Sequence, residues 1–385
     1  MKSFLFAGML VAATIAAPSL ANAQTPEEAV ARDMGEEVLH IPVTVKDMFG
    51  RQETKQIPIT VFRPKGNGPF PLAIMNHGRA TDARRSRQGR QRYEDLSRYL
   101  VAKGFAVLVP TRAGYAETYG DFDPEASGGC NAKRLEPMAD AVFTQVMATL
   151  ELAKTLPFVD ATRWIVVGQS VGGFASVVTV GRHPPGLVAG INFAGGTGGN
   201  PDNRPQDPCS PQAVGRLWHG LAAGAAAPML WLYWQNDMYW GPSIPKLWNA
   251  AWIDGGGKAE MHTLAPVGTD GHGGSGSDMD HWVPIVDTFL AGLGFTTPGL
   301  IVRPPPSRYA GIGDVDKVAL PEASRTGAYQ RFLEARMPRA FAIGPHGAWG
   351  WSSGDWALGK ALGRCARRGE ACRLYAVDGE VVWAP

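Results

Sequence analysis

The sequence predicts an α/β fold: a doubly wound, mostly parallel sheet with helices on both faces, followed by a small α+β module. Between residues 71 and 292, short apolar runs alternate with segments of helical periodicity. The runs, such as Phe105–Val109 and Met229–Trp234, are continuous and not alternating, which is typical of strands buried on both faces. A Pro/Gly-rich stretch then separates this region from a second compact pattern.

The elements of the main region follow one another in a regular order. Residues 38–61 read as two extended segments around the polar turn DMFGRQ, which suits an antiparallel hairpin. The expected strands after it cover residues 71–75, 105–109, 164–167, 187–193, 229–234 and 259–264. The expected helices cover residues 91–103, 135–156, 171–182, 211–223, 245–253 and 281–292.

Domain boundaries follow from changes in composition. We expect a signal peptide over residues 1–23, a main domain over 24–295 with a cap insertion at about 195–227, a Pro/Gly-rich linker over 296–325 and a small C-terminal module over 326–385. In the module we expect a helix at 328–336, a turn GPHGAWGWSSGD, a helix at 355–367 and a hairpin around Asp378-Gly379.

Charge and the N-terminus limit the class of protein. The chain has 37 basic and 35 acidic residues, so its charge gives no reason to expect a nucleic-acid partner. Lys2, a short apolar run and Ala21-Asn22-Ala23 have the form of a secretory signal. Later apolar runs are too short to span a bilayer. The sequence therefore predicts an exported protein, periplasmic or secreted, without a membrane span.

The four cysteines favour two disulfides, because an exported chain meets an oxidising environment. Cys365 and Cys372 are near neighbours and are expected to pair. Cys130 and Cys209 would then join two loops that are far apart in sequence, and would staple the cap. Four unpaired buried thiols are the alternative.

Ser170 is the candidate nucleophile. The apolar run before it leads into Gly168-Gln169-Ser170-Val171-Gly172 and then into a helix-compatible segment. This strand–turn–helix with a G-x-S-x-G pattern is the context of a nucleophile elbow, where glycines leave room for a strained turn. Gly350–Gly354 fits the same pattern around Ser352 but has no apolar strand directly before it. Ser352 is therefore interpreted as a chance match.

Asp237 and His272 are the candidate acid and base. A serine hydroxyl needs a base that is itself oriented by a carboxylate, here expected in the order Ser, Asp, His. Asp237 follows the strand at 229–234, and His272 lies in the Gly-rich loop after the strand at 259–264. His281 is the alternative base, whereas His77 is expected to act as a structural clamp. Asp254 and Asp270 are weaker alternatives for the acid.

An oxyanion hole requires backbone N–H donors from the residue after the nucleophile and from an earlier strand-end loop. These positions correspond to Val171 and Arg79. No H-E-x-x-H, C-x-x-C or EF-hand pattern occurs, and the G-x-G-x-x-G at Gly271 has no strand leading into it. No metal and no other cofactor is therefore expected.

Together NHGR at 76–79, GQSVGG at 168–173, QND at 235–237 and GHG at 271–273 resemble the α/β-hydrolase superfamily, most closely its dienelactone-hydrolase-like branch. The resemblance covers roughly residues 38–293. It implies an α/β-hydrolase fold, with Ser170 as nucleophile, Asp237 as acid and His272 as base. Dienelactone hydrolases carry a cysteine at the elbow, where this chain has Ser170.

The expected function is hydrolysis of a carboxylic ester, small or polymeric, through an acyl-enzyme on Ser170. A serine peptidase of the prolyl-oligopeptidase type shares the triad order and is the alternative. A binding protein on a hydrolase scaffold is the second alternative, which the ordered triad disfavours.

Two further clusters are expected to be mostly structural. The first, an arginine-rich loop at the rim of the site, is interpreted as solvated surface; it holds Arg79, Arg84, Arg85, Arg87, Arg90 and Arg92. The second is an aromatic set around Asp237, interpreted mainly as core packing; it holds Trp231, Tyr233, Trp234, Tyr239, Trp240, Trp248 and Trp252.

Overall fold

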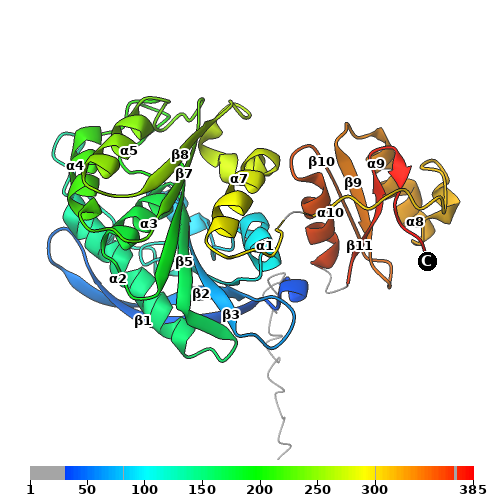
Figure 1. Cartoon of the computed structure of the whole chain (residues 1–385), viewed down its shortest axis with the longest axis horizontal. Helices are drawn as coiled ribbons and strands as arrows, with labels where there is room; N and C mark the ends of the chain where they lie inside the picture. Colours follow the sequence, from blue (N-terminus) through cyan, green and yellow to red (C-terminus); the bar gives the residue numbers. More distant parts are fainter. Residues whose placement is uncertain (1–30, 81, 300, 368–370) are drawn as a thin grey trace, which may run out of the picture.

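The computed structural model of the protein describes residues 31–80, 82–299, 301–367 and 371–385. The predicted signal peptide lies outside these residues. Figure 1 shows two bodies joined by one connection, a large α/β unit and a smaller C-terminal module. The large unit is built on an eight-stranded sheet of order β1-β2-β4-β3-β5-β6-β7-β8, and the module on a four-stranded sheet of order β10-β9-β11-β12.

The strands of the large sheet follow the apolar runs of the sequence. They are β1 (Glu37–Lys46), β2 (Gln52–Phe62), β3 (Phe70–Asn76), β4 (Ala106–Pro110), β5 (Val159–Gln169), β6 (Leu187–Phe193), β7 (Met229–Trp234) and β8 (Ala259–Leu264). β1 pairs antiparallel with β2, and β2 antiparallel with β4. All pairings from β4 through β3 to β8 are parallel. The predicted entry hairpin and parallel sheet are confirmed.

Helices cover both faces of this sheet, so its central strands are buried on both sides. The helices are α1 (Glu94–Ala102), α2 (Leu135–Lys154), α3 (Val171–Gly181), α4 (Pro211–Ala222), α5 (Ile244–Asp254), α6 (Gly274–Ser277) and α7 (Met279–Gly292). In Figure 1, α2 to α5 lie on one side of the sheet, and α1 and α7 lie on the side that faces the C-terminal module. Tyr99 of α1 donates a hydrogen bond of 2.7 Å to Asp287 of α7.

Most of the aromatic set packs in the core, as predicted. The ring centroid of Trp231 lies 5.2 Å from that of Trp218 and 6.3 Å from that of Trp252. Trp218 belongs to α4, which lies within the range predicted as a cap and also packs on α5 and α3. This helix is therefore a regular part of the helical layer, because its apolar face is buried against its neighbours. Of the range predicted as a cap, the loop before α4 lines the pocket that holds Ser170.

The C-terminal module has its own apolar core. Its elements are α8 (Glu322–Ser324), η6 (Arg325–Tyr329), α9 (Gln330–Glu334), β9 (Arg339–Ile343), β10 (Trp349–Ser353), α10 (Ala357–Ala366), β11 (Arg373–Val377) and β12 (Glu380–Val381). Cys365 and Cys372 form the predicted disulfide, which joins α10 to the segment before β11.

Two features of this module differ from the sequence-based expectation. Val318 and Leu320, from the stretch predicted as a linker, are buried in the module's core with Tyr329 and Phe341. Burial of these two apolar side chains holds this part of the stretch against the module, although the residues around them are rich in Pro and Gly. The expected turn at 344–355 instead contains β10, because Trp349 and Trp351 can pack on the sheet from alternate positions of a strand.

No helix within the described residues combines the length and the apolar character needed to cross a membrane.

Candidate active site

Ser170 lies on a sharp turn between β5 and α3. Its backbone has φ 57° and ψ −122°, an unusual conformation for a residue with a side chain. The flanking glycines make this turn possible. A Cβ on Gly168 would lie 2.0 Å from the carbonyl oxygen of Gly172, and a Cβ on Gly172 would lie 2.0 Å from that of Asn76. The predicted elbow geometry is therefore present, with the serine at the carboxyl end of a central strand.

Asp237 and His272 are brought together from the ends of β7 and β8. His272 Nδ1 lies 3.0 Å from Asp237 Oδ2 and 3.2 Å from its Oδ1, within hydrogen-bond distance. Asp237 is fully buried, and its Oδ1 also accepts the backbone N–H groups of Tyr239 at 2.7 Å and Trp240 at 3.1 Å. These donors fix the carboxylate and stabilise its charge. The ring of His272 is stacked on that of Tyr239, with centroids 3.8 Å apart.

The loop that carries His272 is fixed by two polar side chains that the sequence did not single out for this task. Asp270 Oδ1 accepts the backbone N–H of His272 and that of Met238, both at 2.9 Å. Asn236 donates to the carbonyl of Val267 at 3.1 Å and accepts that residue's N–H at 3.1 Å. Asp270, considered above only as an alternative acid, thus ties the His272 loop to the loop that carries Asp237.

Gln169 links the turn that carries Ser170 to the His272 loop and to the loop after β3. Its Nε2 donates to the backbone carbonyl of His272 at 2.9 Å. Its Oε1 accepts the hydroxyl of Tyr93 at 3.0 Å, and the Tyr93 oxygen accepts the N–H of Gly78 at 2.9 Å. One side chain therefore joins the elbow, the His272 loop and the loop after β3. Its position directly before Ser170 in the chain was the only sequence signal for this role.

The loop after β3 runs beside Ser170, where the predicted oxyanion hole requires it. A Cβ on Gly78 would lie 3.2 Å from Ser170 Cβ. Among the described residues, the N–H of Arg79 donates to no backbone carbonyl of a loop or turn, and Val171 begins α3, where an N–H has no acceptor within the helix. Arg79 and Val171 both line the pocket that holds Ser170. Two N–H donors are thus left for a ligand atom.

His77 acts as a clamp for this loop, not as a base. Its Nε2 accepts the backbone N–H of Arg112 at 3.0 Å, so its Nδ1 carries the proton and donates to the carbonyl of Gly78 at 2.6 Å. Burial, together with the charge of Arg112, holds the pKa of His77 well below its ordinary value. Both ring nitrogens are occupied, which leaves none for proton transfer.

Four of the six arginines of the arginine-rich loop are held in ion pairs with little exposure, which corrects the prediction of a solvated surface for them; Arg84 and Arg87 are exposed. Arg79 pairs with Asp123 at 2.6 Å, and Arg85 pairs with the same carboxylate at 2.8 Å. Arg90 and Arg92 pair with the buried carboxylate of Glu36, while Arg84 is 60% exposed. Burial alone would raise the pKa of Glu36, but hydrogen bonds from Arg92, the Ala31 N–H and Arg90 lower it. The carboxylates that pair with these arginines lie far from them in sequence.

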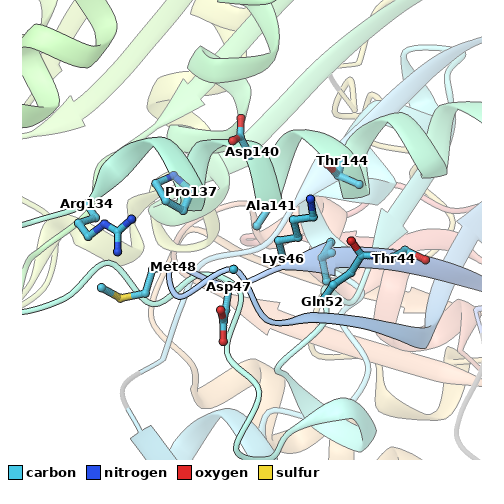
Figure 2. Close-up of a pocket in the computed structure, with 12 residues that line it drawn as sticks. Thr44, Lys46, Asp47, Met48, Gln52, Arg134, Pro137, Asp140, Ala141 and Thr144 are labelled. Carbon is cyan, nitrogen blue, oxygen red and sulfur yellow. The ribbon is translucent and has the colours of Figure 1, made fainter.

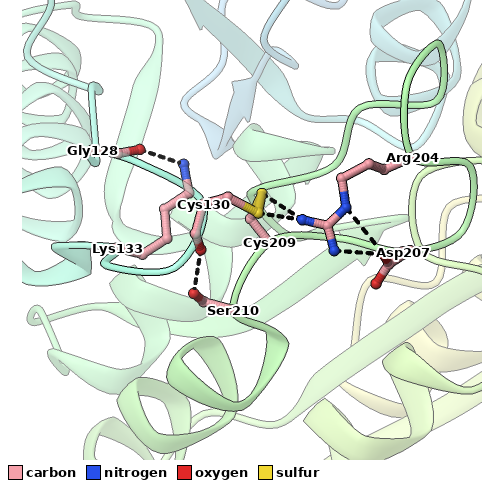
Figure 3. Close-up of a disulfide and its surroundings, with 7 residues drawn as sticks. All are labelled: Gly128, Cys130, Lys133, Arg204, Asp207, Cys209 and Ser210. Carbon is pink, nitrogen blue, oxygen red and sulfur yellow. Dashed lines mark hydrogen bonds and ion pairs between the residues drawn. A yellow bond between two sulfur atoms is a disulfide. The ribbon is translucent and has the colours of Figure 1, made fainter.

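A pocket of about 530 Å³ opens beside Ser170. Its walls come from the hairpin turn at 48–49, the loop at 125–133, the loop at 197–209 and the segment Tyr239–Trp240. The predicted disulfide between Cys130 and Cys209 joins two of these walls (Figure 3). Beside it, Ser210 donates to the carbonyl of Cys130 at 2.6 Å. The covalent bond therefore fixes the width of the pocket on one side.

A second hollow, of about 360 Å³, lies between the β1–β2 hairpin and α2 (Figure 2). Its walls carry Lys46, Arg134 and Asp140. It contains none of the residues of the elbow, acid and base set. We therefore take the Ser170 pocket as the candidate active site.

The competing residues lie in other environments. Ser352 is buried in β10, opposite Ala340 in an antiparallel pairing, and not at a strand-to-helix turn. The side chain of His281 is 76% exposed and pairs with Asp278 at 2.5 Å. His262, in β8, pairs with Glu260 at 2.6 Å near the surface. In the described part of the chain, no group of three or more His, Cys, Asp or Glu side chains could hold a metal ion.

The large sheet places the Ser170 turn after β5, Asp237 after β7 and His272 after β8. This strand order with these three positions is the arrangement of an α/β-hydrolase sheet. The chain has the α/β-hydrolase fold. The fold implied by the sequence resemblance is confirmed.

No family model matches the sequence, and no curated protein matches it. Solved structures of similar fold include a putative dienelactone hydrolase from Klebsiella pneumoniae, at 20% identity and TM-score 0.41, covering 68% of this chain and 98% of that one. An esterase of Pyrococcus furiosus has 10% identity and TM-score 0.45, covering 68% and 95%. An acylaminoacyl peptidase of Pyrococcus horikoshii has 15% identity and TM-score 0.46, covering 68% of this chain but only 42% of the peptidase. At these identities the likeness concerns the hydrolase fold alone.

Proposed function

We propose that this protein is an exported serine hydrolase that cleaves a carboxylic ester through an acyl-enzyme on Ser170. The observation that carries the proposal is the hydrogen bond between Asp237 and His272, in a loop whose backbone is tied to the elbow by Gln169. A histidine oriented by a buried carboxylate, next to a serine on a strained turn, is the arrangement that activates a hydroxyl group.

In the proposed reaction, His272 Nε2 takes the proton of Ser170 Oγ while Oγ attacks the ester carbonyl carbon. His272 Nδ1–H donates to Asp237 throughout, so the carboxylate stabilises the imidazolium that forms. The carbonyl oxygen becomes an oxyanion, which the N–H groups of Val171 and Arg79 would bind. Their positions next to Ser170 and their lack of backbone acceptors among the described residues support this assignment.

Collapse of the tetrahedral intermediate breaks the bond to the alkoxy oxygen, which leaves as an alcohol with the proton from His272. Water then attacks the acyl-enzyme and loses a proton to the same nitrogen, and the acid is released as Ser170 recovers its proton. The two half-reactions balance as ester plus water giving acid plus alcohol. No cofactor enters either step.

The pocket supports a substrate with an apolar part. Met48, Phe49, Tyr239 and Trp240 supply apolar surface close to Ser170, and the Phe49 side chain is 81% exposed at the rim. Because the pocket is open at this rim, both small and polymeric esters are candidates. Export is supported by the N-terminal sequence and by two disulfides, which persist in oxidising compartments.

The proposal is tested by assaying p-nitrophenyl esters beside peptide anilides, with wild type and Ser170→Ala. We expect ester turnover with a burst of p-nitrophenol equal to the enzyme concentration, and loss of both turnover and burst in Ser170→Ala. Turnover of anilides without turnover of esters would favour the peptidase alternative. A wild-type protein that hydrolyses neither would leave a binding protein on this scaffold as the remaining interpretation.

A further inference from the structure

The C-terminal module contacts the large domain through α10 and the residues just before it. Figure 1 shows α10 facing α1 and α7. Arg367, at the end of α10, donates to Glu94 of α1 at 2.8 Å. A Cβ on Gly363 would lie 2.8 Å from Nε of Arg98, so the helix and α1 are in close contact. Trp356, just before α10, is buried in the core of the large domain and not in that of the module.

The first turn of α10, together with Asp355 before it, holds the segment that follows His272. Lys360 Nζ donates to the carbonyl of Gly276 at 3.2 Å, and to Asp355 Oδ2 at 2.9 Å and its carbonyl at 3.0 Å. Asp355 Oδ1 accepts the N–H of Asp280 at 2.9 Å, and Asp280 Oδ2 accepts the N–H of Trp356 at 3.0 Å. Two chain segments thus exchange hydrogen bonds reciprocally, only four to eight residues after His272.

The held segment needs such support because its sequence is rich in glycine. Residues 268–276 contain five glycines, and glycine loses more conformational freedom on ordering than any other residue. On the side of the large domain, Asn236, Asp270 and Gln169 hold the part of the loop up to His272. Beyond His272, Asp278 accepts the indole N–H of Trp234 at 2.6 Å, and Lys360 binds Gly276.

We propose that the C-terminal module is a brace for the catalytic histidine: Lys360 of α10 and Asp355, two residues before this helix, hold the Gly276–Asp280 segment and thereby keep His272 in line with Ser170 and Asp237. Lys360 and Asp355 are positioning residues, since they reach the site only through the loop. The proposal rests on the proposed function and assigns a task to a module that shares no pocket with Ser170.

The test compares Lys360→Met with Lys360→Arg. Methionine keeps the length and apolar stem of the side chain but cannot donate to Gly276, whereas arginine can. We expect Lys360→Met to lower kcat by roughly three- to tenfold with KM nearly unchanged, and Lys360→Arg to recover most of the loss. Arg303→Met is the matched control, because Arg303 binds Asp378, Val377 and Glu380, all inside the module. It should leave kcat at the wild-type value.

A second measurement separates positioning from general destabilisation. Lys360→Met is combined with His272→Ala, and the residual hydrolysis of an activated ester is measured beside the unfolding transition. If the brace acts through His272, Lys360→Met has no further effect once that side chain is gone. The same fractional loss in both backgrounds would overturn the proposal.

Two other results are decisive. A Lys360→Met enzyme with wild-type kcat, in a wild type that is active and dependent on Ser170, would overturn the brace while leaving the hydrolase intact. An inert wild type would overturn the proposed function and the brace with it.

Discussion

The same five-residue pattern occurs twice in this chain and leads to two different structures. Gly168–Gly172 spans the end of a parallel strand and the start of a helix, with Ser170 at φ 57°. Gly350–Gly354 lies mostly in antiparallel strand β10 and leaves Ser352 in extended register with Ala340. Gln169, directly before the first serine, donates to the carbonyl of His272, which pairs with Asp237, whereas the second serine is buried where α10 packs on its sheet. The surrounding elements, and not the pattern, decide which serine lies at a strand-to-helix turn.

The largest expected effect distinguishes the two histidines, His272 and His281, as the base that serves Ser170. His272→Ala should lower kcat/KM for an ester by about 10⁴-fold or more, because Ser170 loses its base. His281→Ala should retain most of the activity, because that side chain is 76% exposed and pairs with Asp278, not with Asp237. Steady-state rates of both variants check the assignment. The reverse pattern would move the base to His281.

The glycines provide a second comparison. Gly172→Ala should lower the free energy of unfolding by about 4–5 kcal/mol, because the new methyl group would overlap the backbone of Asn76. Gly354→Ala should cost only about 1–2 kcal/mol, since Gly354 has φ 78° but open space around it. Denaturant unfolding of the two variants measures both values. Equal losses of unfolding free energy in the two variants would mean that a methyl group at Gly172 is accommodated as easily as one at Gly354.

Removal of the two disulfides should change KM by a smaller amount, and only one of them should change it. The Cys130→Ser/Cys209→Ser pair should raise KM by about tenfold, because two walls of the Ser170 pocket lose their link and must be ordered by the substrate, at about 1.4 kcal/mol. The Cys365→Ser/Cys372→Ser pair, inside the module, should leave KM unchanged. A KM effect confined to the second pair would show that the pocket walls do not depend on Cys130.

The smallest expected effect is a pH dependence from His281. Its hydrogen bond to Asp278 raises its pKa above the ordinary 6.5. The stabilisation is therefore present at pH 5, below that ordinary value, and is lost as the pH rises through the higher pKa of the folded state. The free energy of unfolding at pH 5 minus that at pH 8 should therefore be slightly smaller in His281→Gln than in wild type. An unchanged difference would assign the dependence to other groups.

Prediction from sequence succeeded where local pattern and chain order are enough. The strands are continuous apolar runs, and the elbow, Asp237 and His272 each follow a strand, so their shared edge of the sheet could be expected. The four cysteines also left few pairings to choose among. In these cases the residues that determine an element or a turn lie within a few positions of it in the sequence.

Prediction failed where a side chain's partner is distant in sequence. Arg79 is neutralised by Asp123, and Arg92 by Glu36, pairings that only the tertiary structure brings about. The role of Gln169 depends on Tyr93 and on the carbonyl of His272, which no local pattern connects. Val318 lies in a Pro/Gly-rich stretch that predicts a linker, and the residues that bury it come from other parts of the chain.

Labelling with a fluorophosphonate probe decides between the two serines. The probe bonds covalently to a serine oxygen that a base has activated, and the modified peptide is identified by mass spectrometry. We expect wild type and Ser352→Ala to be labelled equally on the peptide that holds Ser170, and Ser170→Ala to remain unlabelled. Labelling that persists in Ser170→Ala and disappears in Ser352→Ala would contradict the assignment of the active site.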